Sequence, residues 1–275
     1  MSKKRKQKRK KPRATRKGWR ASPQQVGAWL GKAEQQLIEK KYKSVVQSAR
    51  RVLRYVPEDS KPAGEAYNYL GIACSMLQNF DEAYEAFSKA LAVFPEDSMI
   101  WYNRSGAARY TMRFGQSVRD LERALELESK PELRKTCEEA LAFIREIAYK
   151  EMALRGPDFT LDDLIEQQEL FQSALRLMEE KQWAKAEKAL RQVIEMGDAV
   201  PQPWGNLAGC LIMQERYDEA EEALHRALEV DPDYDLAQRN LALLPIMRQS
   251  GMPDFELRHP FKGDELEQSV TFIQE

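Results

Sequence analysis

Hydrophobic residues recur at steps of three and four along most of the chain, the spacing that places side chains on one face of an α-helix. The helical stretches come in pairs, and the pairs repeat every 34 residues. Aligning them gives five repeats, at residues 26–59, 64–97, 98–131, 167–200 and 201–234. This pattern predicts an all-α solenoid in which each repeat is a helix–turn–helix hairpin.

Two columns of the alignment carry most of the signal. Position 17 of every repeat is aromatic: Tyr42, Phe80, Phe114, Trp183 and Tyr217. Position 8 of every repeat is small: Ala33, Gly71, Ser105, Ala174 and Ala208. Small residues at positions 8, 20 and 27 let two helices approach closely, and large residues at positions 4, 17 and 24 fill the space between them. Proline at position 32, as in Pro57, Pro95 and Pro232, ends the second helix because it cannot continue the hydrogen-bond ladder.

This arrangement resembles the tetratricopeptide repeat family, whose pattern is Trp-x2-Leu-Gly-x2-Tyr, then Ala-x3-Phe, Ala and Pro. The resemblance covers 170 of the 275 residues and implies a right-handed superhelix. The chain departs from the pattern at position 7, where Lys32, Arg104 and Ser173 replace leucine. The 35-residue pentatricopeptide arrays that read RNA lack the aromatic column, so they are disfavoured.

The segments outside the repeats complete the predicted organisation. Residues 132–166, between a first block at 26–131 and a second at 167–250, predict a connecting helix to about Leu154. Gly156-Pro157 then predicts a turn, and Thr160 with Asp163 predicts the start of a new helix. A capping helix is expected from Asp235 to Leu244, and residues 251–275 are expected to be irregular. Whether one superhelix runs through both blocks stays open.

Charge is distributed unevenly behind a net value of −1. The first 20 residues hold twelve basic side chains and no acid: Lys3, Lys4, Arg5, Lys6, Lys8, Arg9, Lys10, Lys11, Arg13, Arg16, Lys17 and Arg20. The other 255 residues hold 31 basic and 44 acidic side chains, a net charge of −13. Like charges at this density repel and bury nothing, so residues 1–25 are expected to form a disordered basic arm.

The basic arm is a candidate nucleic-acid site. Twelve cations would neutralise several phosphates of RNA or a ribosome, with an affinity that falls as salt rises. The alternatives are a solubility tail, a segment that folds back on the acidic body, a nuclear-import signal or, with less support, contact with acidic lipids. No apolar stretch follows the charges, so the arm does not resemble a secretory signal.

Catalytic, cofactor and metal chemistry find little support in the sequence. His225 is predicted to lie on a solvated helix face, His259 has no Cys or Ser neighbour, and no phosphate-binding Gly-rich loop is present. Cys74, Cys137 and Cys210 are widely spaced, which disfavours disulfides and zinc and favours a reduced cytoplasmic setting, or a nuclear one in a eukaryote. No apolar run is long enough to span a membrane, and no cofactor is expected.

The resemblance implies a binding groove, because in this family the first helices of the repeats line a concave surface that holds an extended peptide. The groove candidates at the matching positions are Asn68, Tyr102, Asn103, Arg109, Tyr110, Asn206, Met213, Arg239 and Asn240. The asparagines at 103, 206 and 240 share position 6, where an amide can bond a peptide backbone or, equally, bond locally between helices. Capture of chaperone C-terminal carboxylates is disfavoured, since Met99 and Asn103 stand where that clamp has cations.

These observations predict a non-enzymatic scaffold that binds a protein or an extended peptide in the groove. The alternative is an RNA- or ribosome-associated adaptor that uses the basic arm. A third and weaker possibility is an enzyme subunit whose chemistry lies in a partner. Oligomeric state is not indicated by any feature of the sequence.

Overall fold

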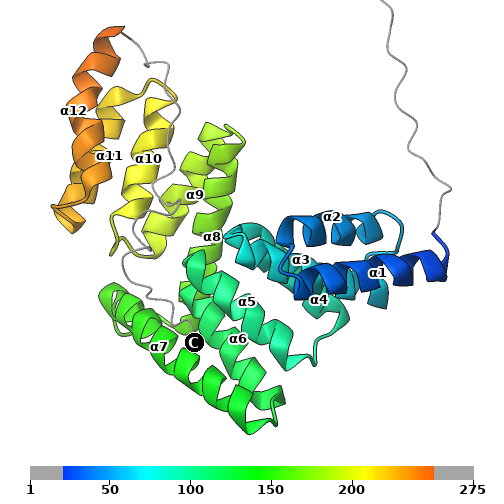
Figure 1. Ribbon diagram of the computed structural model, residues 1–275. Coiled ribbons are helices and arrows are strands. Elements are labelled where there is room, and N and C mark those ends of the chain that lie inside the picture. The colour runs from blue at the N-terminus through cyan, green and yellow to red at the C-terminus, as the bar shows by residue number, and fades with distance from the viewer. Residues whose placement is uncertain (1–20, 251–275) are drawn as a thin grey trace, which may run out of the picture. The chain divides into compact units, whose positions relative to one another are not determined.

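The computed structural model describes residues 21–250, which form twelve α-helices and no β-strand (Figure 1). The helices are α1 (Pro23–Ile38), α2 (Tyr42–Leu53), α3 (Lys61–Met76), α4 (Phe80–Val93), α5 (Ser98–Tyr110), α6 (Phe114–Leu127), α7 (Pro131–Arg155), α8 (Leu161–Glu179), α9 (Trp183–Met196), α10 (Gln202–Ile212), α11 (Tyr217–Val230) and α12 (Asp235–Ser250). The predicted all-α solenoid of helical hairpins is therefore confirmed.

The chain divides into two compact units. The N-terminal unit holds the residues up to Thr111 together with Arg119–Leu141, and the C-terminal unit holds Met112–Val118 and the residues from Ala142 onward. In the N-terminal unit α1 packs on α2 and α3 on α4, and the first helices α1, α3 and α5 contact one another in succession. In the C-terminal unit each helix from α8 to α12 packs on the next.

Every repeat uses the same turn between its two helices. The aromatic residue at position 17 is the first residue of α2, α4, α6, α9 and α11. Two residues earlier the backbone is left-handed, with φ between 56° and 60°, at Lys40, Gln78, Met112, Lys181 and Glu215. In four of these turns the next N–H donates to the carbonyl five residues back, as in Asn79 to Cys74 (2.9 Å) and Arg216 to Leu211 (3.0 Å). This Schellman-type ending satisfies helix carbonyls and fixes the register of the hairpin.

The small and large columns meet inside the hairpins as the alignment predicts. A Cβ atom placed on Gly71, at position 8 of its repeat, would lie 2.6 Å from the ring of Phe87, at position 24. Phe87 is only 1% exposed, so its ring has no free volume into which to move. The residues at positions 20 and 27 are buried in all five repeats: Val45, Val52, Ala83, Ala90, Ser117, Ala124, Ala186, Val193, Ala220 and Ala227.

Successive repeats are joined by bonds that recur in the same register. The Nε1–H of Trp101 donates to the carbonyl of Pro95 (2.8 Å), and the Nε2–H of Gln238 donates to the carbonyl of Pro232 (2.7 Å). Each bond runs from position 4 of one hairpin to position 32 of the hairpin before it. Helix α12 thus packs as the first helix of a further repeat, which is the capping role expected of it.

Two helix ends differ from the sequence prediction. Helix α1 begins at Pro23, so residues 23–25 do not belong to an arm: the Ser22 side chain and Gln25 form a capping box that starts the helix there. Helix α12 does not stop before Pro245 but continues to Ser250, because Leu244 and Met247 are both buried and hold its last turns on the core. The rest of the basic arm and the tail at 251–275 lie outside the described residues.

The segment between the two blocks is one 25-residue helix, α7, followed by a turn and by α8, whose N-terminus is capped by Thr160. A buried amide ties these elements together within the C-terminal unit. Gln167 accepts from the Nε–H of Arg155 (2.6 Å) and donates to the carbonyls of Val193 (2.9 Å) and Gly197 (2.8 Å). Its side chain therefore joins α7, α8 and the end of α9.

Arg104, one of the departures from the family pattern, is held by a buried carboxylate. Its guanidinium donates two hydrogen bonds to Asp120, at 2.7 and 2.6 Å, and lies 4.8 Å from the ring of Trp101. The Asp120 side chain is fully buried and that of Arg104 is 12% exposed. An ion pair with bidentate geometry thus replaces the apolar contact that leucine makes at position 7.

The glycine at position 8 should be intolerant of any side chain. We expect Gly71→Ala to lower the free energy of unfolding by about 1–3 kcal/mol, because the added methyl overlaps the buried Phe87 ring. Gly106→Ala is the control: nothing lies within 4 Å of its Cβ position in α5, so it should raise stability by about 0.5–1 kcal/mol. Urea unfolding followed by circular dichroism measures both, and equal effects would contradict the packing described.

Breaking the buried ion pair should cost far more than breaking a surface pair. We expect Asp120→Asn to lower the free energy of unfolding by about 3–5 kcal/mol, because it leaves the Arg104 charge buried without its counter-charge. Glu229→Gln removes the partner of Arg226, where both side chains are more than 60% exposed, and should cost less than about 1 kcal/mol. The same urea titration compares the two variants, and a loss at Asp120 as small as that at Glu229 would refute a structural role for the pair.

Candidate functional site

The nine groove candidates fall into two sets, one in each unit. Asn68 lies on α3, and Tyr102, Asn103, Arg109 and Tyr110 lie on α5, all in the N-terminal unit. Asn206 lies on α10, Met213 is its C-cap, and Arg239 and Asn240 lie on α12, all in the C-terminal unit. All nine therefore lie on or at the end of first helices, with α12 in the position of a first helix.

In the N-terminal unit the C-terminal ends of the first helices carry a row of apolar and aromatic side chains. We call this row, formed by Ile38, Met76 and Tyr110, the apolar ledge. Tyr110 stacks on Phe80 with ring centroids 4.2 Å apart, and the Arg109 guanidinium lies 4.9 Å from the Tyr110 ring. Ile38 and Met76 occupy the position equivalent to Tyr110 on α1 and α3, and they are 70% and 56% exposed. The sequence prediction did not include Ile38, although position 13, which it shares with Met76 and Tyr110, would have identified it.

The asparagines on first helices use none of their hydrogen-bonding capacity within residues 21–250. Asn68, Asn103, Asn206 and Asn240 make no side-chain hydrogen bond there, whereas Asn79, in a turn, donates to Glu82 at 2.9 Å. Asn206 is only 2% exposed, and its Nδ2 is buried without an acceptor. The Oδ1 of Asn68 is likewise buried without a donor. Local bonding between helices, one of the two interpretations left open by the sequence, is therefore not what the amides do in this structure.

The two remaining candidates in the C-terminal unit are less distinctive. Arg239 pairs with Asp235 at 2.7 Å on the exposed surface of α12, a contact that contributes little. Met213 is half-buried at the end of α10, where a flexible thioether can adapt to an apolar contact.

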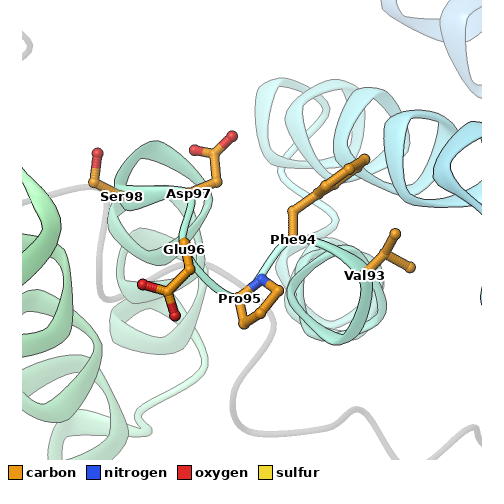
Figure 2. A pocket seen from close by; sticks show the side chains of 6 residues that line it. All are labelled: Val93, Phe94, Pro95, Glu96, Asp97 and Ser98. Atoms are coloured by element: carbon orange, nitrogen blue, oxygen red, sulfur yellow. The ribbon is translucent and has the colours of Figure 1, made fainter.

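The α4–α5 turn forms an open hollow lined by six consecutive residues, Val93, Phe94, Pro95, Glu96, Asp97 and Ser98, and Figure 2 shows their side chains pointing in different directions. Its polar groups already have structural roles. Asp97 caps α5 by accepting from the N–H groups of Met99 (3.0 Å) and Ile100 (3.2 Å), and the Ser98 hydroxyl donates to Glu128 (2.7 Å). The hollow lies at the junction between two repeats. Its polar groups do not point toward a common centre where a small molecule could bind.

The described part of the chain offers few side chains suited to nucleophilic catalysis or to metal binding. Between residues 21 and 250 no group of three or more His, Cys, Asp or Glu side chains is placed to hold a metal ion. All three cysteines are free and buried, and burial raises the pKa of the Cys74 and Cys210 thiols to about 12. Neither forms the reactive thiolate at neutral pH. His225 is exposed on α11, and His259 lies outside the described residues.

No helix between residues 21 and 250 combines the length and apolarity needed to cross a membrane. The nucleic-acid candidates Lys3 to Arg20 all lie outside the described part of the chain. Their role stays a prediction from the sequence.

The solved structures similar to this chain have low sequence identity to it. YrrB, described as a TPR protein with an unusual peptide-binding site, is 17% identical, with a TM-score of 0.36 over 78% of this chain and 91% of its own. MamA is 13% identical, with a TM-score of 0.36 over 78% and 97%. The TPR2AB domain of yeast Sti1, in a pHSP90 complex, is 14% identical, with a TM-score of 0.38 over 82% and 84%.

No curated protein sequence matches the chain. Two family models do, and both are described as the tetratricopeptide repeat: one matches residues 64–97 and the other residues 177–244. The first coincides with the hairpin α3–α4, and the second covers α9, α10 and α11 together with the end of α8 and the first part of α12. The chain therefore contains tetratricopeptide repeats at residues 64–97 and 177–244.

Proposed function

We propose that the chain is a non-enzymatic protein-interaction scaffold that binds an extended segment of a partner protein on the faces of its first helices. The observation that carries this proposal is the set of four asparagines, Asn68, Asn103, Asn206 and Asn240, whose amides have no hydrogen-bond partner within residues 21–250. They recur on four first helices, at the positions where the family binds peptides.

The energetic argument concerns Asn68 and Asn206, whose Oδ1 and Nδ2 atoms respectively are buried without a partner. A buried donor or acceptor without a partner destabilises a fold by about 1–3 kcal/mol, which an apolar side chain of similar size would avoid. Each residue of an extended peptide presents one N–H and one carbonyl, and an asparagine amide can both donate and accept. A bound backbone would therefore supply the missing partners without requiring one particular ligand sequence.

The apolar ledge of the N-terminal unit would add affinity to such backbone contacts. Ile38, Met76 and the stacked Tyr110 lie at equivalent positions of α1, α3 and α5, and α3 contacts each of the other two helices. Aromatic side chains and methionine are enriched at binding surfaces because they bury large areas and adapt to different partners. We infer that apolar side chains of the partner segment pack along this ledge.

The proposal predicts that removing an amide weakens binding without weakening the fold. Peptides selected from a random twelve-residue phage library on the full chain should bind Asn103→Ala or Asn206→Ala about tenfold more weakly, measured by fluorescence polarisation. The free energy of unfolding should stay unchanged or rise, because the lost amide has no partner in the free chain. The two variants report on the N-terminal and C-terminal units separately.

Asn79→Ala provides the matched control for this experiment. Its amide bonds Glu82 in a turn, so the variant should lose stability and keep its peptide affinity. Selected peptides that bind both first-helix variants as tightly as the unaltered chain would refute a binding role for the amides.

A second candidate function rests on charge alone: the first 20 residues hold twelve cations and no acid. We propose that they bind RNA, and that the affinity depends on the number of phosphates they neutralise. For a single-stranded RNA the logarithm of affinity should fall with the logarithm of salt concentration at a slope of about −0.7 per phosphate contact. Changing Lys3, Lys4, Arg5 and Lys6 to glutamine should make this slope shallower by about 2–3. An unchanged slope, or no binding at low salt, would exclude the arm as the RNA contact.

A further inference from the structure

Aromatic and basic side chains meet between α1 and α2, the first two helices of the N-terminal unit (Figure 1). The guanidinium of Arg51 lies 4.3 Å from the ring centroid of Trp29, and the ring of Tyr55 lies 5.4 Å from the same ring, tilted by 46°. Lys32 follows Trp29 by about one turn of α1, and Arg54 follows Arg51 at the C-cap of α2; both are exposed. We call these five residues the basic patch.

The register of the hairpin places Lys32 beside the same part of α2. Trp29, Lys32 and Gln36 are spaced three and four residues apart, so they share one face of α1. The Ser48 hydroxyl of α2 donates to the amide oxygen of Gln36 at 2.8 Å, and Arg51 stacks on Trp29. Both neighbours of Lys32 on this face therefore contact α2, and the five residues of the patch lie along one side of the hairpin.

The cations of the patch are not neutralised by the described residues. The side chains of Lys32, Arg51 and Arg54 form no hydrogen bond or ion pair within residues 21–250, whereas Arg50 pairs with Glu82 of α4. Exposed lysines without partners also occur in the C-terminal unit, at positions 181 and 188, but neither stacks on a ring there. The combination of free cations with contacting aromatic rings distinguishes the patch.

Trp29 is available for this role because of its place in the repeat pattern. It stands at position 4, where Trp101 donates from its indole to the carbonyl of Pro95 in the preceding hairpin. Within the described residues no hairpin precedes α1, and the indole N–H of Trp29 makes no hydrogen bond there. Arg51 and Tyr55 contact its ring instead, and Tyr55 is itself 36% exposed.

The first hairpin also differs in charge from the rest of the chain. Residues 21–57 hold seven basic and two acidic side chains, a net charge of +5, and no acid occurs between Glu39 and Glu58. Residues 58–275 hold 24 basic and 42 acidic side chains, a net charge of −18. An anion is therefore attracted to the first hairpin and repelled by the remainder. Residues 1–20 carry the same sign as the patch, so their charge adds to this attraction.

We propose that the basic patch binds single-stranded nucleic acid, an inference that deepens the second proposed function by adding a folded contact to the basic arm. Lys32, Arg51 and Arg54 neutralise phosphates, and a base stacks on the exposed ring of Tyr55 or on the guanidinium plane of Arg51. An acidic peptide supplies the charge without the flat faces of bases, and the bases of a duplex are already stacked. Only a single strand matches both halves of the patch.

Fluorescence polarisation of a labelled oligouridylate of twelve nucleotides on the full chain tests the charged half. Arg51→Gln with Arg54→Gln should weaken binding about tenfold and make the salt slope shallower by about 1.4, since each lost phosphate contact contributes about 0.7. Lys181→Gln with Lys188→Gln is the control, because it removes the same charge from two exposed, unpaired lysines of the C-terminal unit. Far-ultraviolet circular dichroism should be the same for both. Equal effects of the two double variants on affinity would overturn the proposal.

Stacking is tested separately from charge at Tyr55. Tyr55→Leu keeps an apolar contact with Trp29 but removes the ring, so it should weaken oligouridylate binding about fivefold, whereas Tyr55→Phe should bind like the unaltered chain. An abasic oligomer of the same length keeps the phosphates, so it should bind more weakly than the oligouridylate and be insensitive to Tyr55→Leu. If the abasic oligomer or polyglutamate of equal charge binds as tightly as the oligouridylate, the patch is a general anion site and the proposal is wrong.

The variant with glutamine at positions 3–6 separates the patch from the arm. Ultraviolet cross-linking of the oligouridylate to that variant, followed by peptide mass spectrometry, should still modify Trp29 or Tyr55, because the patch is unaltered. Cross-links at the patch with an unchanged salt slope would support the patch and exclude the arm. Cross-links confined to residues 1–20 in the unaltered chain would leave the arm as the RNA contact and overturn the patch.

Discussion

The close approach of the two helices of each hairpin is the constraint on which the rest of the fold depends. At Gly71 the space that a Cβ atom would take is filled by the ring of Phe87, and the equivalent position of every repeat is small and buried. The shared left-handed turn holds the helices in this register, and bonds such as Trp101 to Pro95 set one hairpin against the next.

Much of the fold could be predicted from the sequence because the packing rule repeats. The aromatic column marks the first residue of each second helix, and the small column marks the contact between helices. The turns could not be predicted in the same way: their left-handed residues are Lys, Gln, Met and Glu, none of which signals that conformation locally. Pro245 led to a wrong prediction of where α12 ends. Proline is a strong local signal for a helix end, but the burial of Leu244 and Met247 outweighs it. From the sequence, Arg104 could be identified only as a departure from the family pattern. Its partner, Asp120, is sixteen residues away on another helix, so no local signal indicates the ion pair.

The candidate site was predicted only in part. The position of the asparagines on first helices follows from the repeat alignment, but whether their amides bond locally is a matter of a few ångströms that the sequence does not encode. Ile38 was missed, although position 13, which it shares with Tyr110, would have identified it in the repeat alignment.

Net charge is consequently a poor guide to what this chain binds. Much of the excess acid in the body is engaged in pairs between repeats that recur in register, such as Arg50 with Glu82 and Arg191 with Glu219. An acid already paired offers a new cation little, because binding must first displace the existing partner. Carboxylates of residues 21–250 that have no such partner, among them Asp59, Glu132, Glu166 and Glu222, are the ones a new cation can bind without displacing another. A net charge of −1 conceals the division of charge between the first 20 residues and the rest of the chain.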